Sequence, residues 1–489
     1  MPGDGIESMP YKIALYGFGS FPVVYRHLVE TARAEHSPVE FCLILTAPNW
    51  RQVVRDVLPT EDILDLFAEL PLEPLGGHQS LLANYDGSLI EDLAALKWER
   101  RKHGGRWRRN QGMDIYRLYI NFLVNRRATH LLMSNIETPD AKIAVAAARE
   151  LGLGIMAPAD LRNMSGTYFS TDSYETPPAY AASTPEARTR AVKFIRTFRQ
   201  QALPARSLPS DIDLANDDGT ILESYLPRFG ARVGGFVKAT LERPDLFDHE
   251  AIRVSLMRNF SFIRSSLRGL RRKYNEKQYD ISHADLLPSR FVYYPLQYTP
   301  ESSINVPSPY FVDQFRVVDA LRFAMPNDCT LIVKEHPACV EMRPSSFMRH
   351  MRNLPGVEVA KATIPSNELI QRAALTATVT GTAAFEALLM GRPAIAFGRG
   401  LSAWALNGST PLGNLRDRMQ IAITKLAPDD FVVDQIAKLF DARYPFIFTT
   451  AHLPGEPMLR RGNIGRFWTA IVDHLARERA AMATAKPDG

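Results

Sequence analysis

The sequence predicts an α/β protein with two domains, each built on a parallel sheet. Short apolar runs typical of buried strands alternate with amphipathic or alanine-rich segments of helical length. This alternation occurs twice, once between residues 11 and 156 and again between residues 291 and 397. The 489 residues are sufficient for two or three domains, so both stretches can form a core of their own.

Four regions are expected along the chain. Residues 1–185 form a first Rossmann-like domain, and residues 289–460 form a second one. Between them, residues 186–288 lose the strand signal and carry prolines and acidic loops, so a mainly helical linker or insertion is predicted. Residues 461–489 are predicted to be a C-terminal helix with a polar tail, and the helix is expected to cross back to the first domain.

Composition narrows the class of protein. Hydrophobic residues make up 46% and charged residues 23%, as in ordinary soluble globular proteins. A net charge of +5 is compatible with acidic partners or a membrane surface but too small to indicate nucleic-acid binding. We expect buried free thiols at Cys42 and Cys329, and a cytoplasmic location without a signal peptide or membrane span.

The first domain opens with a strand–glycine loop–helix–strand unit. Strands are predicted over 11–16 and 39–45, with a helix to about residue 35 between them. The loop holds Gly17, Gly19 and Ser20, but it lacks the third glycine and the later acidic residue of a dinucleotide site. The glycines are therefore expected to let the loop approach another ligand or a neighbouring strand.

Asp160 is the candidate catalytic carboxylate of the first domain. Strands at 128–133 and 153–156 flank an alanine-rich helix at 138–151, and Asp160 follows the second strand. An acid at a strand's carboxyl end can serve as nucleophile, general base or ligand-orienting group. A helix cap or a loop-turning residue is the structural alternative.

Three further segments carry charge. Residues 99–109 interleave basic residues with Trp107 and form either a solvated loop or a site for an anionic glycan or lipid. The acidic pair Asp211 and Asp213 lies in a polar loop and is interpreted as coincidental. Residues 252–274 predict an amphipathic helix whose apolar stripe packs on a core, with a basic face toward solvent or an anionic membrane.

The second domain contains the stretch with the clearest chemistry. Strands are predicted at 291–297, 331–333, 376–380 and 394–397, and helices at 310–323 and 383–390. Gly391 fits the left-handed position just after a helix, and Pro393 prevents the helix from continuing. Ligands gather at the carboxyl ends of parallel strands, where several polar residues of this stretch fall.

These polar residues suit a phosphate-bearing ligand. Thr380, Gly381 and Thr382 lie between a strand and a helix, where unpaired backbone N–H groups and hydroxyls favour an anion. Lys334 and His336 follow another strand and supply cationic or donor groups. Glu386 lies one helical turn beyond Thr382, and its carboxylate suits a ribose diol. Gln297 lies at the end of a predicted strand, and its amide suits a base or sugar. The structural alternative is a Gly/Thr turn beside a surface Lys-His pair.

Three ordered motifs resemble the capsule polysaccharide biosynthesis/export family, which includes Kdo (3-deoxy-manno-octulosonic acid) transferases. They are Tyr294–Ser303, the Lys-Glu-His-Pro run at 334–337, and Thr380–Ala387 with Gly391-Arg392-Pro393. The resemblance covers roughly residues 289–400. In the first domain only Asp160 matches the acidic-glycine motif of the family, because the neighbouring acid and glycine are absent.

The resemblance implies a GT-B-like fold, in which two Rossmann-like domains face a cleft and the second holds a nucleotide sugar. It implies catalytic roles for Asp160 and His336, and an acceptor-side role for the loop of Gly17, Gly19 and Ser20. The remaining candidates are assigned to the donor nucleotide. They are Gln297, Lys334, His336, Pro337, Thr380, Gly381, Thr382 and Glu386.

The expected function is that of a metal-independent glycosyltransferase of capsular polysaccharide synthesis without a cofactor. The resemblance implies Kdo or a related acidic sugar from a CMP-linked donor, and a glycan or lipid-linked glycan acceptor. Contact with the inner face of the cytoplasmic membrane or with capsule assembly and transport proteins is also expected. Two alternatives stay open: another nucleotide-sugar enzyme, such as an epimerase or polyol-phosphate transferase, or a non-catalytic partner in capsule assembly or export.

Overall fold

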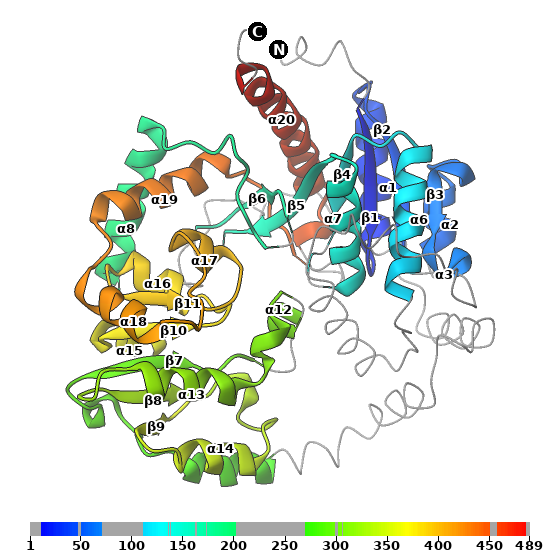
Figure 1. Cartoon of the computed structure of the whole chain (residues 1–489). Coiled ribbons are helices and arrows are strands. Elements are labelled where there is room, and N and C mark those ends of the chain that lie inside the picture. The colour runs from blue at the N-terminus through cyan, green and yellow to red at the C-terminus, as the bar shows by residue number, and fades with distance from the viewer. Residues whose placement is uncertain are drawn as a thin grey trace. The chain divides into compact units, whose positions relative to one another are not determined.

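In the computed structural model, two compact units carry the described part of the chain. Described residues up to Ala182 and from Ala442 onward form unit 1, and those between Ser183 and Asp441 form unit 2. Each unit contains one mostly parallel sheet with helices on both faces, which confirms the predicted α/β class (Figure 1). The structure describes residues 11–46, 50–70, 111–134, 136, 138–161, 164–172, 174–201, 269–298, 302–305, 307–449 and 457–485.

Unit 1 has a six-stranded sheet in the order β3-β2-β1-β4-β5-β6. All neighbouring pairs are parallel except β5 and β6, which are antiparallel. Its strands are β1 (Lys12–Gly17), β2 (Glu40–Leu45), β3 (Ile63–Asp65), β4 (His130–Met133), β5 (Gly154–Asp160) and β6 (Thr167–Ser170). Its helices are α1 (Phe21–Ala34), α2 (Arg51–Arg55), α3 (Leu66–Glu69), α6 (Gln111–Asn125), α7 (Pro139–Glu150) and α20 (Arg461–Ala485).

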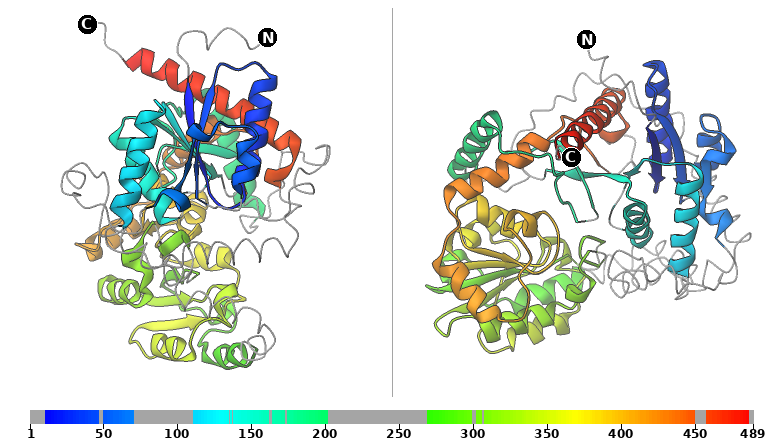
Figure 2. Two further views of the ribbon diagram at one scale, coloured as in Figure 1. Left: turned by 90° about the vertical axis from the view of Figure 1, so that its right-hand side faces the viewer. Right: turned by 45° about the horizontal axis from the view of Figure 1, so that its top comes forward.

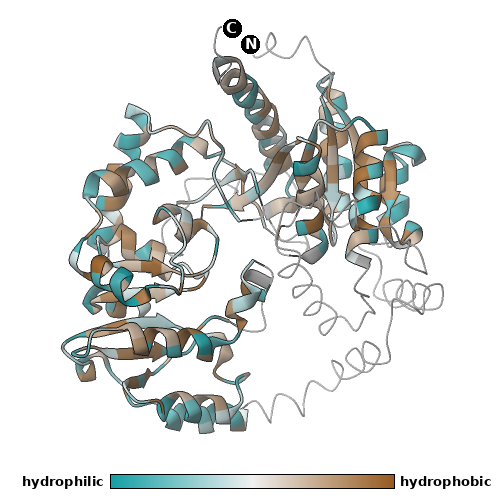
Figure 3. Cartoon of the chain, in the orientation of Figure 1, coloured by the Kyte–Doolittle hydropathy of each residue, from teal (hydrophilic) through white to brown (hydrophobic). Residues whose placement is uncertain are grey.

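Two separate cores bury the two faces of this sheet. Along β1, Ile13 and Leu15 enter one core with residues of α1 and α20, whereas Ala14 and Tyr16 enter the other with residues of α6 and α7. A parallel sheet that is covered on both sides needs apolar residues at successive positions, which explains the continuous apolar runs in the sequence. Figure 3 shows the hydrophobic residues along these strands.

The C-terminal segment completes unit 1. Tyr444 pairs with Thr167 at the edge of β6, and α20 packs against α1. Phe467 and Trp468 of α20 are buried in the same core as Leu15 and Leu28. Figure 2 shows α20, in red, together with the blue β1–α1 segment from two further sides. The return of the C-terminal helix to the first domain is therefore confirmed.

Unit 2 has a five-stranded, fully parallel sheet in the order β11-β10-β7-β8-β9. Its strands are β7 (Phe291–Pro295), β8 (Thr330–Lys334), β9 (Val357–Ala360), β10 (Leu375–Thr378) and β11 (Ala394–Ala396). Its helices are α8 (Pro185–Gln201), α12 (Ser302–Asn305), α13 (Gln314–Ala324), α14 (Ser345–Arg352), α15 (Ser366–Arg372), α16 (Ala383–Leu389), α17 (Leu401–Ala405), α18 (Leu415–Thr424) and α19 (Asp429–Ala442).

This second sheet is also covered on both faces. Val292 and Tyr294 of β7 join a core with α13, α14 and α18, whereas Phe291 and Tyr293 join a core with α15 and α16. The first strand of each unit is thus central in its sheet. The second and third strands of the unit lie on one side of it, and the fourth and later strands lie on the other side. In both units the strand order therefore reverses beside the first strand, between β1 and β4 and between β7 and β10.

Most predicted elements are present, with shifted ends. The left-handed conformation of Gly391 is confirmed by its φ of 67°, and Cys42, Cys329 and Cys339 are all buried and free. The predicted helix at 310–323 is divided, because a 3-10 turn at Pro309–Val312 precedes α13.

Three charged segments complete the comparison with the sequence. At the described end of the predicted 252–274 helix, Leu270 and Tyr274 are 65% and 42% exposed. The prediction that the apolar stripe packs on a core is therefore wrong at this end. The basic segment 99–109 and the pair Asp211 and Asp213 lie outside the described residues.

Candidate functional site

The carboxyl ends of β7 and β10 bring Gln297 and the Thr380–Gly381 turn together. Gln297 lies two residues beyond β7, and its Nε2 donates to Oγ1 of Thr378, the last residue of β10, at 3.1 Å. The Thr380 hydroxyl donates to Oε1 of Gln297 at 3.4 Å. These contacts span the point where the strand order reverses, which is the usual ligand position in open α/β sheets.

Gly381 lies at this point because no side chain fits there. A Cβ at residue 381 would lie 2.9 Å from Oγ1 of Thr378 and 3.3 Å from Nε2 of Gln297. The Gly381 N–H donates to Thr378 at 3.2 Å, and its carbonyl accepts from the Ser402 hydroxyl at 2.9 Å. The expectation of an unpaired backbone N–H for an anion is therefore wrong at Gly381, because this N–H is bound to Thr378. The glycine is required by the close approach of Thr378 and Gln297.

A second glycine beside this turn borders a buried hydroxyl. A Cβ at Gly398, just beyond β11, would lie 2.4 Å from Oγ of Ser308 and 2.9 Å from Cγ2 of Thr380. Ser308 is 4% exposed, and its hydroxyl has no hydrogen-bond partner among the described residues. A buried polar atom without a partner costs free energy, so an available donor beside the reversal point fits a polar ligand there.

Lys334 is buried at the end of β8. It is 5% exposed, and its Nζ donates to the Ser366 hydroxyl at 2.8 Å. Burial lowers the pKa of Lys334 to about 8, although the Glu386 carboxylate acts in the opposite direction. The ammonium is therefore mostly protonated at neutral pH, and it adds positive potential without being an exposed contact.

Thr382 and Glu386 interact with each other at the start of α16. The Thr382 hydroxyl donates to Oε1 of Glu386 at 2.9 Å and makes no cap bond to the backbone. Since α16 has only seven residues, its dipole adds little to anion binding. The expectation that both threonine hydroxyls are available for an anion is wrong in this structure, because Thr380 and Thr382 both donate to side chains.

His336 is exposed at the end of the loop that follows β8. Its Nδ1 accepts from the Ala338 N–H at 3.2 Å, so the neutral ring carries its proton on Nε2. The ring lies 5.4 Å from that of Tyr298, centroid to centroid. Pro337 begins the 3-10 turn Pro337–Cys339, which fixes the chain direction just after the histidine.

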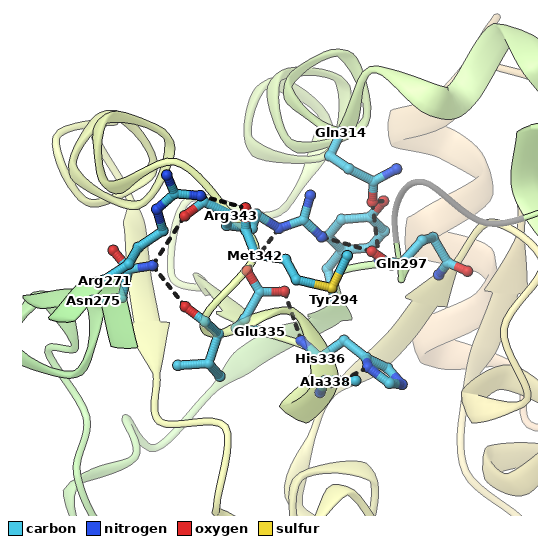
Figure 4. Close-up of polar contacts among 11 residues, drawn as sticks. Arg271, Asn275, Tyr294, Gln297, Gln314, Glu335, His336, Ala338, Met342 and Arg343 are labelled. Atoms are coloured by element: carbon cyan, nitrogen blue, oxygen red, sulfur yellow. Dashed lines mark hydrogen bonds and ion pairs between the residues drawn. The ribbon is translucent and has the colours of Figure 1, made fainter. Parts of the chain in front are cut away.

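Between Lys334 and His336, Glu335 forms an ion pair that the sequence analysis missed (Figure 4). Its Oε2 accepts from Nε of Arg343 at 2.7 Å, and its Oε1 accepts from the His336 N–H at 2.7 Å. Burial raises the pKa of Glu335 despite the opposing effect of Arg343. A carboxylate next to a strand end with an arginine eight residues later was the available signal.

The candidates in unit 1 lie on a different sheet. Asp160 is the last residue of β5, exposed, and paired with Thr167 of β6. Gly17 ends β1, and a Cβ there would come within 3.3 Å of Leu43 and the Ile44 carbonyl of β2, so close strand packing explains this glycine. Gly19 has a φ of 59°, and Ser20 precedes α1 without a side-chain cap bond.

At the reversal point of unit 1, a serine binds to the backbone. The Ser134 hydroxyl donates to the Tyr16 carbonyl at 2.6 Å and accepts from the Phe18 N–H at 2.9 Å. Ser134 is 3% exposed, so the polar groups between β1 and β4 satisfy one another. Asp160 is separated from this point by β4.

The part of the chain that the structure describes contains neither a cluster of metal-ligating side chains nor a helix suited to span a bilayer. No group of three or more His, Cys, Asp or Glu side chains there is placed to hold a metal ion. Within the same residues, no helix combines the length and hydropathy needed to cross a bilayer.

Comparison with known families identifies part of unit 2. Residues 250–442 match the family model described as capsule polysaccharide biosynthesis protein. All three motifs that carry the sequence resemblance fall within this range, so the resemblance is confirmed there. No curated protein matches the chain.

The solved structures that match this chain share little sequence with it. The KpsC β-Kdo 2,7 transferase of Thermosulfurimonas dismutans is 11% identical over 83% of this chain and 88% of its own, with a TM-score of 0.33. UDP-GlcNAc 2-epimerase of Neisseria meningitidis, bound to UDP-GlcNAc, is 10% identical over 95% of this chain and 100% of its own, with a TM-score of 0.22. TM-scores this low carry no argument about function.

Proposed function

We propose that this chain, of which residues 250–442 match the capsule polysaccharide biosynthesis family, is a glycosyltransferase that uses a nucleotide-sugar donor. The observation that carries the proposal is the polar cluster of Gln297, Thr378 and Thr380 at the reversal point of unit 2. This is where α/β sheets bind nucleotides, and Gln297 and Thr380 belong to the motifs that carry the sequence resemblance.

The donor is proposed to be a CMP-linked acidic sugar, with Kdo as the first choice. Glycosyl transfer breaks the bond between the anomeric carbon and the phosphate oxygen, so negative charge develops on the departing nucleotide. His336 can donate from Nε2 to this phosphate, and the buried Lys334 stabilises the same charge through its potential. Gln297 and Glu386 remain the candidates for the base and the ribose diol.

Asp160 is proposed as the catalytic carboxylate and the β1–α1 loop as the acceptor side. An exposed carboxylate at the end of a strand can accept the proton of an attacking hydroxyl. An Asp160→Asn enzyme should lose turnover while nucleotide affinity and melting temperature stay unchanged. The matched control is Glu150→Gln, at the exposed end of α7 in the same unit. Turnover equal to wild type in Asp160→Asn would remove this residue from the mechanism.

The nucleotide is tested first, by thermal shift with CMP, CDP, UDP and GDP, each with and without EDTA. A nucleotide at a hundredfold excess over its dissociation constant stabilises the folded state by about 2.7 kcal/mol. Stabilisation by CMP that is indifferent to EDTA supports a metal-independent CMP-sugar transferase and leads to a transfer assay with CMP-Kdo. Stabilisation by UDP instead would change the donor, and no response to any nucleotide would favour a non-catalytic capsule partner.

The His336→Ala variant separates binding from folding in the same assay. Because the ring is exposed, the melting temperature should change little. The shift caused by the binding nucleotide should shrink, with affinity about tenfold weaker for one lost hydrogen bond to a charged phosphate. Lower stability with unchanged affinity would mark His336 as structural.

A peripheral membrane contact is proposed for the exposed start of the described 269–298 segment. Leu270 is 65% exposed, and Arg271, Arg272 and Lys273 beside it are exposed as well. Basic residues around an exposed apolar side chain favour an anionic lipid surface. Cosedimentation with anionic but not neutral vesicles, reduced in Leu270→Gln, is the expected result. Equal recovery with both vesicle types would exclude this contact.

A further inference from the structure

The buried pair Glu335–Arg343 joins the two loops that carry Gln297 and His336 (Figure 4). Glu335 is 1% exposed, and Arg343 has a side-chain exposure of 6%. Removing two charges from water is costly, and replacing a buried pair with apolar residues is often neutral for stability or stabilising. Stability alone therefore does not explain an ion pair at this position.

Each member of the pair also holds a backbone group. Glu335 accepts from the His336 N–H at 2.7 Å, and Nη2 of Arg343 donates to the Gln297 carbonyl at 2.6 Å. Gln297 follows β7 and His336 follows β8, and these strands are neighbours in the sheet. One ion pair thus links the loops after two adjacent strands.

Arg343 is itself fixed from two further sides. Nδ2 of Asn275, which is fully buried, donates to the carbonyls of Arg343 at 3.1 Å and Val340 at 2.7 Å. The Arg343 guanidinium lies 4.7 Å from the ring centroid of Phe347. The arginine is therefore part of a rigid support, whereas a surface arginine would sample many rotamers.

The other side of Gln297 is held in the same way. Its N–H donates to Oε1 of Gln314 at 3.2 Å, and the Tyr294 hydroxyl donates to the same oxygen at 2.7 Å. The N–H and the carbonyl of Gln297 are thus both bound, and from this fixed backbone its side chain reaches the hydroxyls of Thr378 and Thr380.

We propose that Glu335 and Arg343 are positioning residues of the nucleotide site, which set the backbone of Gln297 and His336 in the geometry that binds the donor. This inference rests on the proposed function, because a nucleotide is the ligand that the two loops would hold. Neither residue is a catalytic group. They act through the two loops, whose side chains meet the ligand, and preorganisation of this kind raises affinity by reducing the ordering cost of binding.

The decisive variant is the double replacement Glu335→Met with Arg343→Met, which removes both charges and keeps the volume apolar. We expect a melting temperature close to that of wild type and about tenfold weaker binding of whichever nucleotide the screen identifies. Amide hydrogen exchange at residues 296–298, 336 and 338 should be faster without any ligand, whereas exchange in β9 and β11 stays unchanged.

A further variant separates the charge of Arg343 from the reach of its guanidinium group. Arg343→Lys keeps the positive charge beside Glu335 but removes the planar fork that also reaches the Gln297 carbonyl. It should therefore fold normally and bind nucleotide more weakly. The matched control replaces the half-buried Asp319–Arg322 pair of α13, joined at 2.7 Å, by Asn and Gln, and it should leave affinity and loop exchange unchanged.

Each outcome decides the inference. Wild-type affinity together with wild-type loop exchange in the double variant would overturn it. Faster exchange throughout unit 2 with a large loss of melting temperature would overturn it as well, since the pair would then support the whole fold. If the wild-type protein binds no nucleotide, the proposed function fails, and loop exchange in the ligand-free variants still decides whether the pair positions these residues.

Discussion

The first five strands of each sheet follow the same order, yet the reversal points of the two sheets are built from different chemistry. In each unit the first strand is central, and the order reverses beside it, at β1 and β4 or at β7 and β10. Between β1 and β4 the short side chain of Ser134 binds two backbone groups. Between β7 and β10 the long side chain of Gln297 contacts two threonine hydroxyls.

This difference shows that the strand order determines where a ligand site can form. The residues of the loops at that point determine whether polar side chains are available to bind a ligand. At Ser134 the backbone polar groups are satisfied within the fold. At Gln297 the backbone is held by Gln314 and Arg343. Its side-chain amide contacts the Pro295 carbonyl and the hydroxyls of Thr378 and Thr380, and a ligand can also bind these two hydroxyls. A fold alone therefore does not identify the binding unit, in agreement with the general independence of fold and function.

The units also differ in that the C-terminal helix α20 packs on the sheet of unit 1. Truncating a buried side chain of this helix gives the largest expected loss of stability. Trp468 of α20 is 1% exposed, and its Nε1 donates to Glu35 at the end of α1 at 2.8 Å. Trp468→Ala should cost unit 1 about 3–5 kcal/mol, as for other buried aromatic truncations. Hydrogen exchange should accelerate in peptides from β1 and β2, while peptides from β7 and β8 keep their protection.

Trp468→Phe is the matched control, because it keeps most of the buried area and loses only the indole N–H. Its effect should be clearly smaller than that of Trp468→Ala. If both units lost protection equally in the alanine variant, the C-terminal helix would stabilise the whole chain, and the contrast between the units would not hold.

A buried histidine makes unit 1 sensitive to acid. His474 is 1% exposed, its Nδ1 is 2.6 Å from the Tyr180 hydroxyl, and burial lowers its pKa to about 4. Between pH about 6.5 and about 4 the unfolded chain binds a proton here and the folded chain does not. Stability therefore falls as the pH falls, by about 3 kcal/mol in full.

His474→Gln tests this effect while keeping an acceptor for Tyr180. The variant should lose less stability than wild type between pH 7 and pH 4, as measured by urea unfolding of unit 1. Part of the acid sensitivity should remain because of Glu478. Burial raises the pKa of this carboxyl, but the bond to His130 outweighs burial and holds the pKa below its usual range. Identical pH profiles would mean that the pKa of His474 is the same in the folded and unfolded chains.

The sequence predicted the sheets well because their signals are local. Parallel strands covered on both sides give continuous apolar runs, and the glycine after α16 adopts the left-handed conformation that its position requires. The motif residues after β7, β8 and β10 were predicted to meet at one edge. Gln297 and Thr380 do so, since strand ends in one parallel sheet necessarily share an edge.

The rest depended on contacts between distant residues. Nothing local indicates that Arg343 reaches the Gln297 carbonyl, or that Asn275 holds the loop of Arg343 from 68 positions away. Thr382 is different, because its hydroxyl was expected to face an anion and instead binds Glu386, only four residues later on the same helix. Side-chain partners are set by tertiary packing, which a pattern of residue types does not contain.

The smallest effects compare the two reversal points directly, through Ser134→Ala and Gln297→Ala. Ser134→Ala leaves the Phe18 N–H without its partner, so unit 1 should lose about 1–3 kcal/mol and nucleotide affinity should not change. Gln297→Ala should cost less stability and weaken nucleotide binding about tenfold, which is ~1.4 kcal/mol. Urea unfolding and nucleotide titration of both variants give the four numbers. If Gln297→Ala lowered stability as much as Ser134→Ala and left affinity unchanged, both reversal points would be structural, and the donor would have to bind elsewhere in unit 2.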